Sequence, residues 1–234
     1  MNDASERIDI VIPVFRGEGA VRRCLESVFA SDAARIADIV VVDDASPEPA
    51  VSEYLQALAA DNKVILLRHE HNQGFVESVN EAAGLHPDRD FVILNADTEV
   101  AGDWLQRLQH HARHNDAIAT VTPFSNNATI ASFPKLIESN ALPRGETTTS
   151  LHALFSSENH QCAVDMPTAI GFCTLIRRAA WQEAKGFDIV FGRGYGEEVD
   201  FCCKLSANGW QHLLAADVFV FHEGGVSFLS LIHI

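Results

Sequence analysis

Short apolar runs alternate with helical patterns along the first half of the chain. Each run is typical of a β-strand that is covered on both faces, because it is almost entirely apolar and far too short to span a membrane. Between the runs, apolar residues recur three or four positions apart, which predicts amphipathic helices. The predicted strands are 8–15, 39–42, 64–67 and 91–94, and the predicted helices include 21–28, 51–58 and 79–83.

This alternation of strands and helices, with short connections, predicts an α/β fold with a mostly parallel central sheet. A helix at 104–114 and a strand at 118–121 follow. The stretch 123–165 is rich in Ser, Asn, Thr and Pro, and its weak periodicity predicts a long irregular insert. Regular structure is predicted to return with strands at 171–176 and 218–221 and a helix around Trp181.

Composition and charge narrow the class of protein. The chain has 234 residues, of which 47% are hydrophobic and 21% charged, and this balance predicts a compact core. A net charge of −15 argues against nucleic acid as a partner, since phosphate backbones are bound by clustered Lys and Arg. A small phosphorylated ligand stays compatible with this charge, because a metal ion can supply the positive charge.

The cysteines and the chain ends bear on location. Five cysteines without a CxxC pair predict reduced, mostly buried thiols and a cytoplasmic protein: Cys24, Cys162, Cys173, Cys202 and Cys203. We expect no signal peptide and no transmembrane segment, because no apolar run reaches about 18 residues. The apolar ending 226–234 predicts either a docked terminal element or a chain cut short.

Polar clusters follow four of the predicted strands, at 43–44, 71–72, 95–99 and 222–223. Ligands of open α/β sheets bind at the carboxyl ends of the strands, so these clusters predict one pocket at that edge. Asp97 is suited there to a hard divalent cation that bridges to phosphate oxygens. The alternative is that Asp97 caps the helix that begins near Asp103.

A second fold-level interpretation competes with a phosphate–metal pocket. Gly17 and Gly19 after the first strand, with Asp43 and Asp44 after the second, imitate the dinucleotide fingerprint of Rossmann-type NAD(P)-dependent oxidoreductases. Arg22 occupies the third glycine position, which weakens the match. This interpretation also assigns no role to Asp97, Glu198 or His222.

Seven short motifs occur along the chain in one order: IVIPVF at 10–15, VVDDAS at 41–46, NQGF at 72–75 with Asn80, LNADT at 94–98, GFC at 171–173, GYGEEVD at 194–200 and HEGG at 222–225. In this order and spacing the chain resembles the family 2 inverting glycosyltransferases of the GT-A fold, from residue 8 to about 228. Within the family it is similar to rhamnosyltransferases and other O-antigen-type enzymes.

The resemblance implies a single GT-A-like domain over 1–234, with a nucleotide-binding half at about 1–122 and an acceptor-side half at about 123–234. It implies metal-dependent, inverting transfer of a hexosyl or deoxyhexosyl group from a UDP-, dTDP- or GDP-sugar to a hydroxyl of a glycan or lipid-linked acceptor. The expected setting is surface polysaccharide biosynthesis in the cytoplasm or, by peripheral association, at the inner face of the membrane. A non-catalytic nucleotide-sugar binding module is the alternative.

The resemblance also assigns donor-site residues. Pro13, Phe15, Asp43 and Asp44 would hold the nucleotide, with Asp44 accepting a hydrogen bond from the base. Two further residues, Asn72 and Gly74, would approach the ribose or diphosphate, where glycine permits close backbone contact. Ordinary turn and loop roles for Asp44 and for 72–74 stay open as alternatives.

Asp97 corresponds to the last acid of the family's Asp-x-Asp metal motif, and Asn95 stands where the first acid is expected. Asn95 supplies a neutral oxygen that can reach ribose or a metal-bound water. His222 would be the second protein ligand of the metal. We expect Mn²⁺ or Mg²⁺, and the imidazole favours Mn²⁺.

An inverting transfer needs a general base, and the resemblance places it at Glu198, with Glu197 before it. The family has Asp at this position, so either glutamate is a candidate; favourable charge at a helix start is the alternative role. Asp200 would orient the loop or cap the helix. The loop 191–196, with Arg193 and Tyr195, would close over the donor, and this loop, Gly171 and the stretch 123–165 would serve the acceptor.

Some residues are expected to have no chemical role. His110, His111 and His114 are interpreted as a surface cluster on an exposed helix. Cys202 and Cys203 are interpreted as packing residues, because no partner base for a catalytic thiol is evident.

Overall fold

The first half of the chain has the predicted alternation of strands and helices. The computed structural model describes residues 7–31 and 33–225. The elements are β1 (Ile8–Val14), α1 (Glu18–Ala30), the 3₁₀ turn η2 (Ala33–Arg35), β2 (Ile36–Asp43), α2 (Pro49–Ala60), β3 (Ile65–Arg68), α3 (Phe75–Gly84) and β4 (Phe91–Leu94).

The second half is more regular than its sequence predicts. Its elements are β5 (Thr98–Glu99), α4 (Trp104–Ala112), β6 (Ile118–Ser125), η3 (Thr129–Ala131), α5 (Thr148–Glu158), β7 (Ala163–Met166), β8 (Cys173–Ile176), α6 (Arg178–Ala184), η4 (Ile189–Phe191), α7 (Glu197–Ser206) and β9 (Gln211–His222).

The prediction of an irregular insert at 123–165 was therefore wrong in part. The stretch contains α5, whose start is fixed by a capping box between Thr147 and Ser150. Helix α5 has little amphipathic pattern, which is why periodicity alone missed it. The last strand also begins well before the predicted 218, because β9 extends from Gln211 to His222 between two other strands.

The sheet confirms the predicted α/β class. Its strand order is β3-β2-β1-β4-β8-β6-β9-β5, with β7 beside β9. The pairs β2–β3, β1–β2 and β1–β4 are parallel, and β8 is antiparallel to both β4 and β6. Since β9 is parallel to β6, the strands β3, β2, β1, β4, β6 and β9 all run in one direction. Their carboxyl ends therefore meet at one edge.

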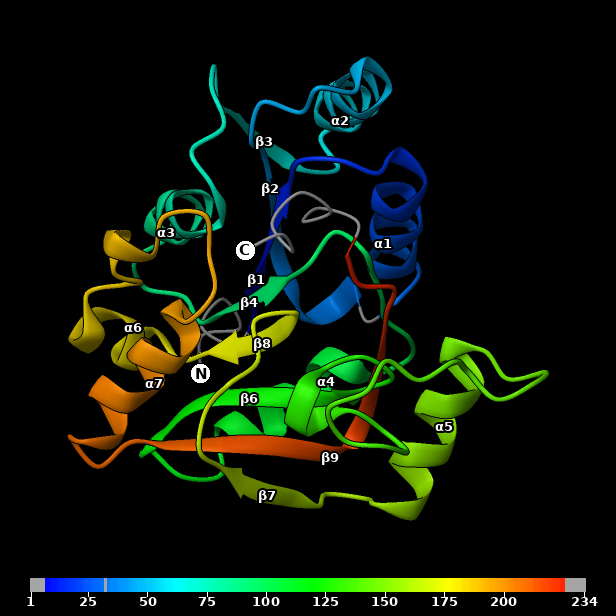
Figure 1. Ribbon diagram of the computed structural model, residues 1–234, viewed down its shortest axis with the longest axis vertical. Coiled ribbons are helices and arrows are strands. Elements are labelled where there is room, and N and C mark those ends of the chain that lie inside the picture. The colour runs from blue at the N-terminus through cyan, green and yellow to red at the C-terminus, as the bar shows by residue number, and fades with distance from the viewer. Residues whose placement is uncertain (1–6, 32, 226–234) are drawn as a thin grey trace.

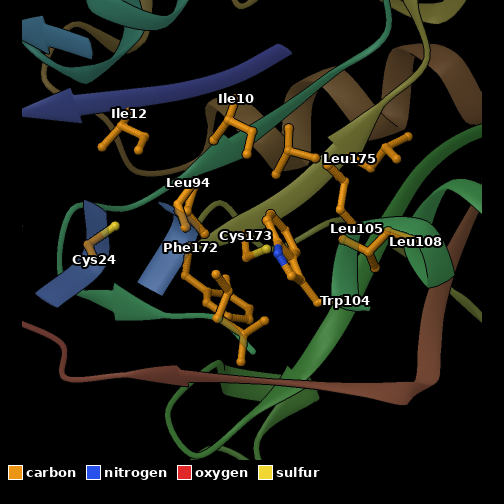
Figure 2. Packing of buried hydrophobic residues seen from close by; sticks show 14 of the residues in the cluster. Ile10, Ile12, Cys24, Leu94, Trp104, Leu105, Leu108, Phe172, Cys173 and Leu175 are labelled. Carbon is orange, nitrogen blue, oxygen red and sulfur yellow. The ribbon is translucent and has the colours of Figure 1, made fainter. Parts of the chain in front are cut away.

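Helices cover both faces of the sheet (Figure 1). Apolar residues of α1, α2 and α4 pack on one face, and those of α3, α6 and α7 pack on the other. Figure 2 shows the first of these cores, where Trp104 and Leu105 of α4 lie against side chains from the strands, among them Ile10, Leu94 and Leu175. This two-sided burial explains why strands such as β4 and β8 are almost entirely apolar.

Two expectations about individual side chains were wrong. His111 is buried, and its Nε2 lies 2.7 Å from Oδ1 of Asp217 on β9, so only His110 and His114 fit the expected surface cluster. Cys203 is exposed and is therefore no packing residue, whereas Cys202 is buried. Within the described part of the chain, no helix is both long and apolar enough to cross a membrane.

Candidate functional site

A cavity of about 520 Å³ opens at the carboxyl edge of the sheet. It gathers residues from the ends of β1, β2, β4 and β9 and from the loop that precedes α7. Most of the predicted site residues line it: Pro13, Phe15, Asp44, Asn72, Gly74, Asn95, Asp97, Gly171, Arg193, Tyr195, Glu197, Glu198 and His222. Asp43 and Asp200 lie outside this lining.

Asp44 anchors the loop between β3 and α3. Its Oδ1 accepts hydrogen bonds from the backbone N of Gln73 and from Nδ1 of His69, both at 2.7 Å. Its Oδ2 accepts from the backbone N of Gly74 at 2.9 Å. Because three donors hold this buried carboxylate, its position at the cavity wall is fixed by the loop it binds.

Asp43 has the turn role that was considered for Asp44. It is fully buried, and its Oδ1 accepts from the backbone N of Ser46 at 2.8 Å. Its Oδ2 accepts from the hydroxyl of Ser52 at 2.7 Å. These bonds shape the turn from β2 into α2. They engage both oxygens of the carboxylate that the resemblance assigned to the nucleotide.

Gly74 is where this loop meets the loop before α7. Its φ is +94°, and a Cβ at this position would lie 2.9 Å from Cα of Arg193 and 3.0 Å from the carbonyl oxygen of Gly192. Both atoms are backbone, so neither can swing aside. Glycine is therefore required here both by its conformation and by the close approach of the second loop.

Asp97 and His222 come together through the pairing of β5 with β9, in which Thr98 stands opposite His222. Nε2 of His222 lies 3.3 Å from Oδ1 of Asp97. The other ring nitrogen, Nδ1, donates to the backbone carbonyl of Asn127 at 2.6 Å. A carbonyl oxygen only accepts, so Nδ1 carries a proton and Nε2 is the atom that faces the carboxylate.

The Asp97–His222 pair fits a divalent cation. A carboxylate oxygen and an imidazole nitrogen converge at the cavity wall. The Asn127 carbonyl accepts from the far ring nitrogen and fixes the tautomer, as such acceptors do for metal-bound histidines. Although burial lowers the pKa of His222, its hydrogen bond with Asp97 raises it. The capping alternative for Asp97 does not hold, because the N-cap residue of α4 is Asp103.

A second group of potential ligands lies elsewhere. Asp9, Asp38 and His86 are close together near the amino ends of β1 and β2. Nη1 of Arg89 lies 3.0 Å from Oδ1 of Asp9 and 2.6 Å from Oδ2 of Asp38. Since one guanidinium bridges both acids, we interpret this group as an ion-pair network at the far edge of the sheet.

Glu197 and Glu198 begin α7, and both line the cavity. Glu197 is 4% exposed, whereas Glu198 is only half-buried. The Oε2 atom of each is buried without a hydrogen-bond partner among the described residues. Burial, reinforced by the charge of Glu198, raises the pKa of Glu197 to about 7. Unpaired buried acid oxygens in a cavity are typical of groups that meet a ligand.

The remaining predicted residues divide between the cavity and the surface. Asp200 forms an ion pair with Lys204 at 2.6 Å, one turn along α7. Arg193 and Tyr195 line the cavity from a loop whose backbone has positive φ at Gly194, Tyr195 and Gly196. The loop has the left-handed geometry that presents the start of α7 to the cavity.

Several residues of the wall had no individual role assigned from the sequence: Arg16, Phe75, Ser78, Asn127 and Phe172. Of these, Phe75 and Phe172 stand in the quoted motifs, and Asn127 lies in the stretch expected to serve the acceptor. Asn127 matches a glycosylation sequon, which obscured its position just after β6. The apolar-to-polar change after 118–124 is the signal that would have placed it at the same edge as Asp97.

The amino end of α1 argues against a dinucleotide site. The backbone N of Gly17 lies 3.2 Å from both carboxylate oxygens of Glu48, and the N of Glu18 lies 3.2 Å from Oε2. In the Rossmann arrangement this helix terminus binds the pyrophosphate. Here a carboxylate of the protein itself occupies that place, so the oxidoreductase interpretation does not fit.

Comparisons with known proteins bear on the family and the fold. An uncharacterized glycosyltransferase from Haemophilus influenzae is 18% identical over 114 residues, which cover 49% of this chain and 35% of that protein. A crystal structure of GalNAc-T7 with UDP, GalNAc and Mn²⁺ matches with a TM-score of 0.71 at 18% identity, covering 94% of this chain and 44% of its own. The chain thus spans less than half the length of these relatives.

The structural match confirms the GT-A fold, while the rhamnosyltransferase and O-antigen refinement stays a prediction. The family model of glycosyl transferase family 2 matches residues 9–184, which is most of the chain. On this match, and with the fold in agreement, the chain belongs to glycosyl transferase family 2.

Proposed function

We propose that this chain transfers a sugar from a nucleoside-diphosphate donor to an acceptor hydroxyl, with inversion at the anomeric carbon. One observation carries the proposal. A single cavity brings together a loop anchored by Asp44, the Asp97–His222 pair and the unpaired acid oxygens of Glu197 and Glu198. These are the three parts that such a transfer needs: a donor seat, a charge-neutralising centre and a base.

The donor would lie along the carboxyl ends of β1 and β2. Oδ2 of Asp44 receives one hydrogen bond from the protein, so it has acceptor capacity left for an N–H of the base. UDP, dTDP and GDP all offer such an imino N–H. Pro13 and Phe15 would form the apolar wall beside the base, and Asn72 and Gly74 would approach the ribose and diphosphate.

Asp97 and His222 would hold Mn²⁺ or Mg²⁺ through Oδ1 and Nε2. When bound, the ion would neutralise charge that develops on the departing diphosphate. This need is plain in a protein of net charge −15, where Arg16 and Arg193 are the arginines that border the cavity among the described residues. The structural neighbour GalNAc-T7 contains both UDP and Mn²⁺, which supports the same arrangement here.

Glu198 would remove the proton from the acceptor hydroxyl. It is the less buried acid of the pair, so an acceptor that enters from solvent reaches it before Glu197. A carboxylate in this role contributes about 10²–10⁴ in rate. The acceptor would be a glycan or lipid-linked sugar at the cytoplasmic face of the membrane, in surface polysaccharide assembly, a setting that rests on the family resemblance.

Donor binding is tested by calorimetric titration of UDP, dTDP and GDP with and without Mn²⁺. We expect one of them to bind only with metal, and to lose binding in Asp97→Ala and His222→Ala. Asp116→Ala, at an exposed position outside the cavity, is the matched control and should bind as the unchanged protein does. Absence of binding for all three diphosphates in both conditions would refute the proposed donor site.

Catalysis is tested separately with Glu198→Gln. We expect this variant to keep its affinity for the diphosphate and to lose at least about a hundredfold in turnover, measured as nucleotide release from the matching nucleotide sugar. A non-catalytic binding module would show no turnover in either form. Proton NMR of the product's anomeric centre decides between inversion and retention.

A further inference from the structure

His69 lies directly after β3 and joins two acids from different elements. Its Nδ1 lies 2.7 Å from Oδ1 of Asp44, which follows β2. Its Nε2 lies 2.6 Å from Oε2 of Glu81 on α3. The imidazole and the Asp44 side chain are buried, at 4% and 6% exposed, whereas the side chain of Glu81 is 51% exposed. Nothing in the proposed reaction uses this histidine.

Both contacts are satisfied only when His69 carries a proton on each ring nitrogen. A neutral imidazole has one N–H, and its other nitrogen would present a lone pair to a carboxylate oxygen. The imidazolium instead donates two charge-assisted hydrogen bonds. Burial lowers the pKa of His69, but the hydrogen bonds to Asp44 and Glu81 outweigh this and raise it.

The other charges near His69 do not compete for its ring. Arg68 and Glu70 flank it in the chain, and Arg68 is ion-paired with Asp43 at 3.6 Å. Asp44 and Glu81 are thus the acids that face the imidazole from the elements packed against it.

These contacts form a closed ring of interactions around the loop between β3 and α3. Asp44 binds the backbone N of Gly74, Gly74 precedes α3, and α3 carries Glu81. His69 joins Glu81 back to Asp44. Loss of a His69 proton would remove one link of this ring. Without the contact to His69, the Asp44 carboxylate is held by the backbone N–H groups of Gln73 and Gly74 alone.

We propose that His69 is a positioning residue which, as an imidazolium, holds Asp44 and the loop 72–74 in the geometry that binds the nucleoside part of the donor. The inference rests on the proposed function, because it needs a nucleotide at Asp44. The direction of the pH dependence follows, because the imidazolium is the form that holds the loop. The affinity for the nucleoside diphosphate is full at low pH and is lost as His69 deprotonates.

The test is the pH dependence of diphosphate binding between pH 5.5 and 8.5. The tightest binder of UDP, dTDP and GDP is titrated with Mn²⁺, and inorganic pyrophosphate with Mn²⁺ is titrated in parallel. The ratio of the two affinities removes the titration of the metal site, and the same ratio measured in His69→Asn accounts for the difference between the phosphates. We expect this ratio to fall about tenfold with rising pH, the effect of one charge-assisted hydrogen bond.

Three variants test whether the fall of the affinity ratio with rising pH is due to His69. In His69→Asn, the amide can still donate to Asp44 but does not titrate, so the fall should be absent. Glu81→Gln removes one of the two acids and should move the fall to lower pH. His86→Asn is the control, because His86 also pairs with a buried acid, Asp9 at 2.7 Å, but outside the cavity.

Thermal unfolding at each pH confirms that the variants are folded. The inference is overturned if His69→Asn keeps the pH profile of the unchanged protein, or if Glu81→Gln leaves the profile in place. If the unchanged protein binds pyrophosphate and no nucleoside diphosphate, or binds neither, the proposed donor site and this inference fail together. If it binds a nucleoside diphosphate with a profile independent of His69, only the inference fails.

Discussion

Replacing Glu197 by Gln should make the protein more stable at alkaline pH while it impairs function. Glu197 is 4% exposed, and burial together with Glu198 raises its pKa to about 7, from 4.5 in the unfolded chain. At about 1.36 kcal/mol per pH unit, the difference corresponds to about 3 kcal/mol. This is the free energy that folding loses when the buried carboxyl must ionise.

The sign of the effect depends on pH. Below pH 4.5 the carboxyl is neutral in both the folded and the unfolded state, so it contributes nothing. Between pH 4.5 and 7 the unfolded chain ionises first, and the stability of the unchanged protein falls as pH rises. Glu197→Gln stays neutral throughout. We therefore expect a gain of about 3 kcal/mol at pH 8 and of less than about 1 kcal/mol at pH 5.

Urea unfolding at pH 5 and pH 8, followed by tryptophan fluorescence, measures this gain. Glu53→Gln is the matched control, since Glu53 is exposed on α2 and should give no pH-dependent gain. Turnover of Glu197→Gln should fall, because the acid borders the cavity in which we propose that the transfer occurs. An equal stability change at both pH values, or no gain at pH 8, would mean that the carboxylate is already solvated or paired, and would refute the reasoning.

Three further substitutions test one loop at the cavity and two buried parts of the fold. Gly74→Ala should lower the free energy of unfolding by about 1–3 kcal/mol, because the φ of residue 74 is positive. It should also weaken diphosphate binding at least about tenfold by calorimetry. Undiminished binding would mean that the loop before α7 moves aside without cost. Asp217→Asn should lower the free energy of unfolding in urea by about 3–5 kcal/mol. The substitution removes the negative charge of a buried side chain that binds Arg107 and His111. Burial raises the pKa of Asp217, but these partners lower the pKa below its usual range. The stability that Asp217 contributes should therefore disappear as pH falls below about 4. A loss of stability that begins at neutral pH would contradict this assignment. Trp104→Ala should cost about 3–5 kcal/mol at every pH, and a loss near zero would mean that the core refills the space.

The sequence alone determined the architecture and the edge of the sheet that carries the site. Apolar runs such as 8–14 and 91–94 are buried on both faces, and that burial is what their composition reports. Polar residues that follow such runs must lie at one edge once the strands are parallel. For this reason Asp44, Asp97 and His222 could be predicted to meet without any knowledge of their contacts.

Only the tertiary structure decided what each polar group does there. Asp43 and Asp44 are neighbours in the chain, yet one serves a turn and the other the cavity, because the pleat sends successive side chains in opposite directions. His69 acquires its role from Glu81 on α3, and the seat of a dinucleotide is closed by Glu48. These partners lie from 12 to 31 positions apart in the chain. Which of them meet depends on strand register and helix packing, and no local pattern encodes that.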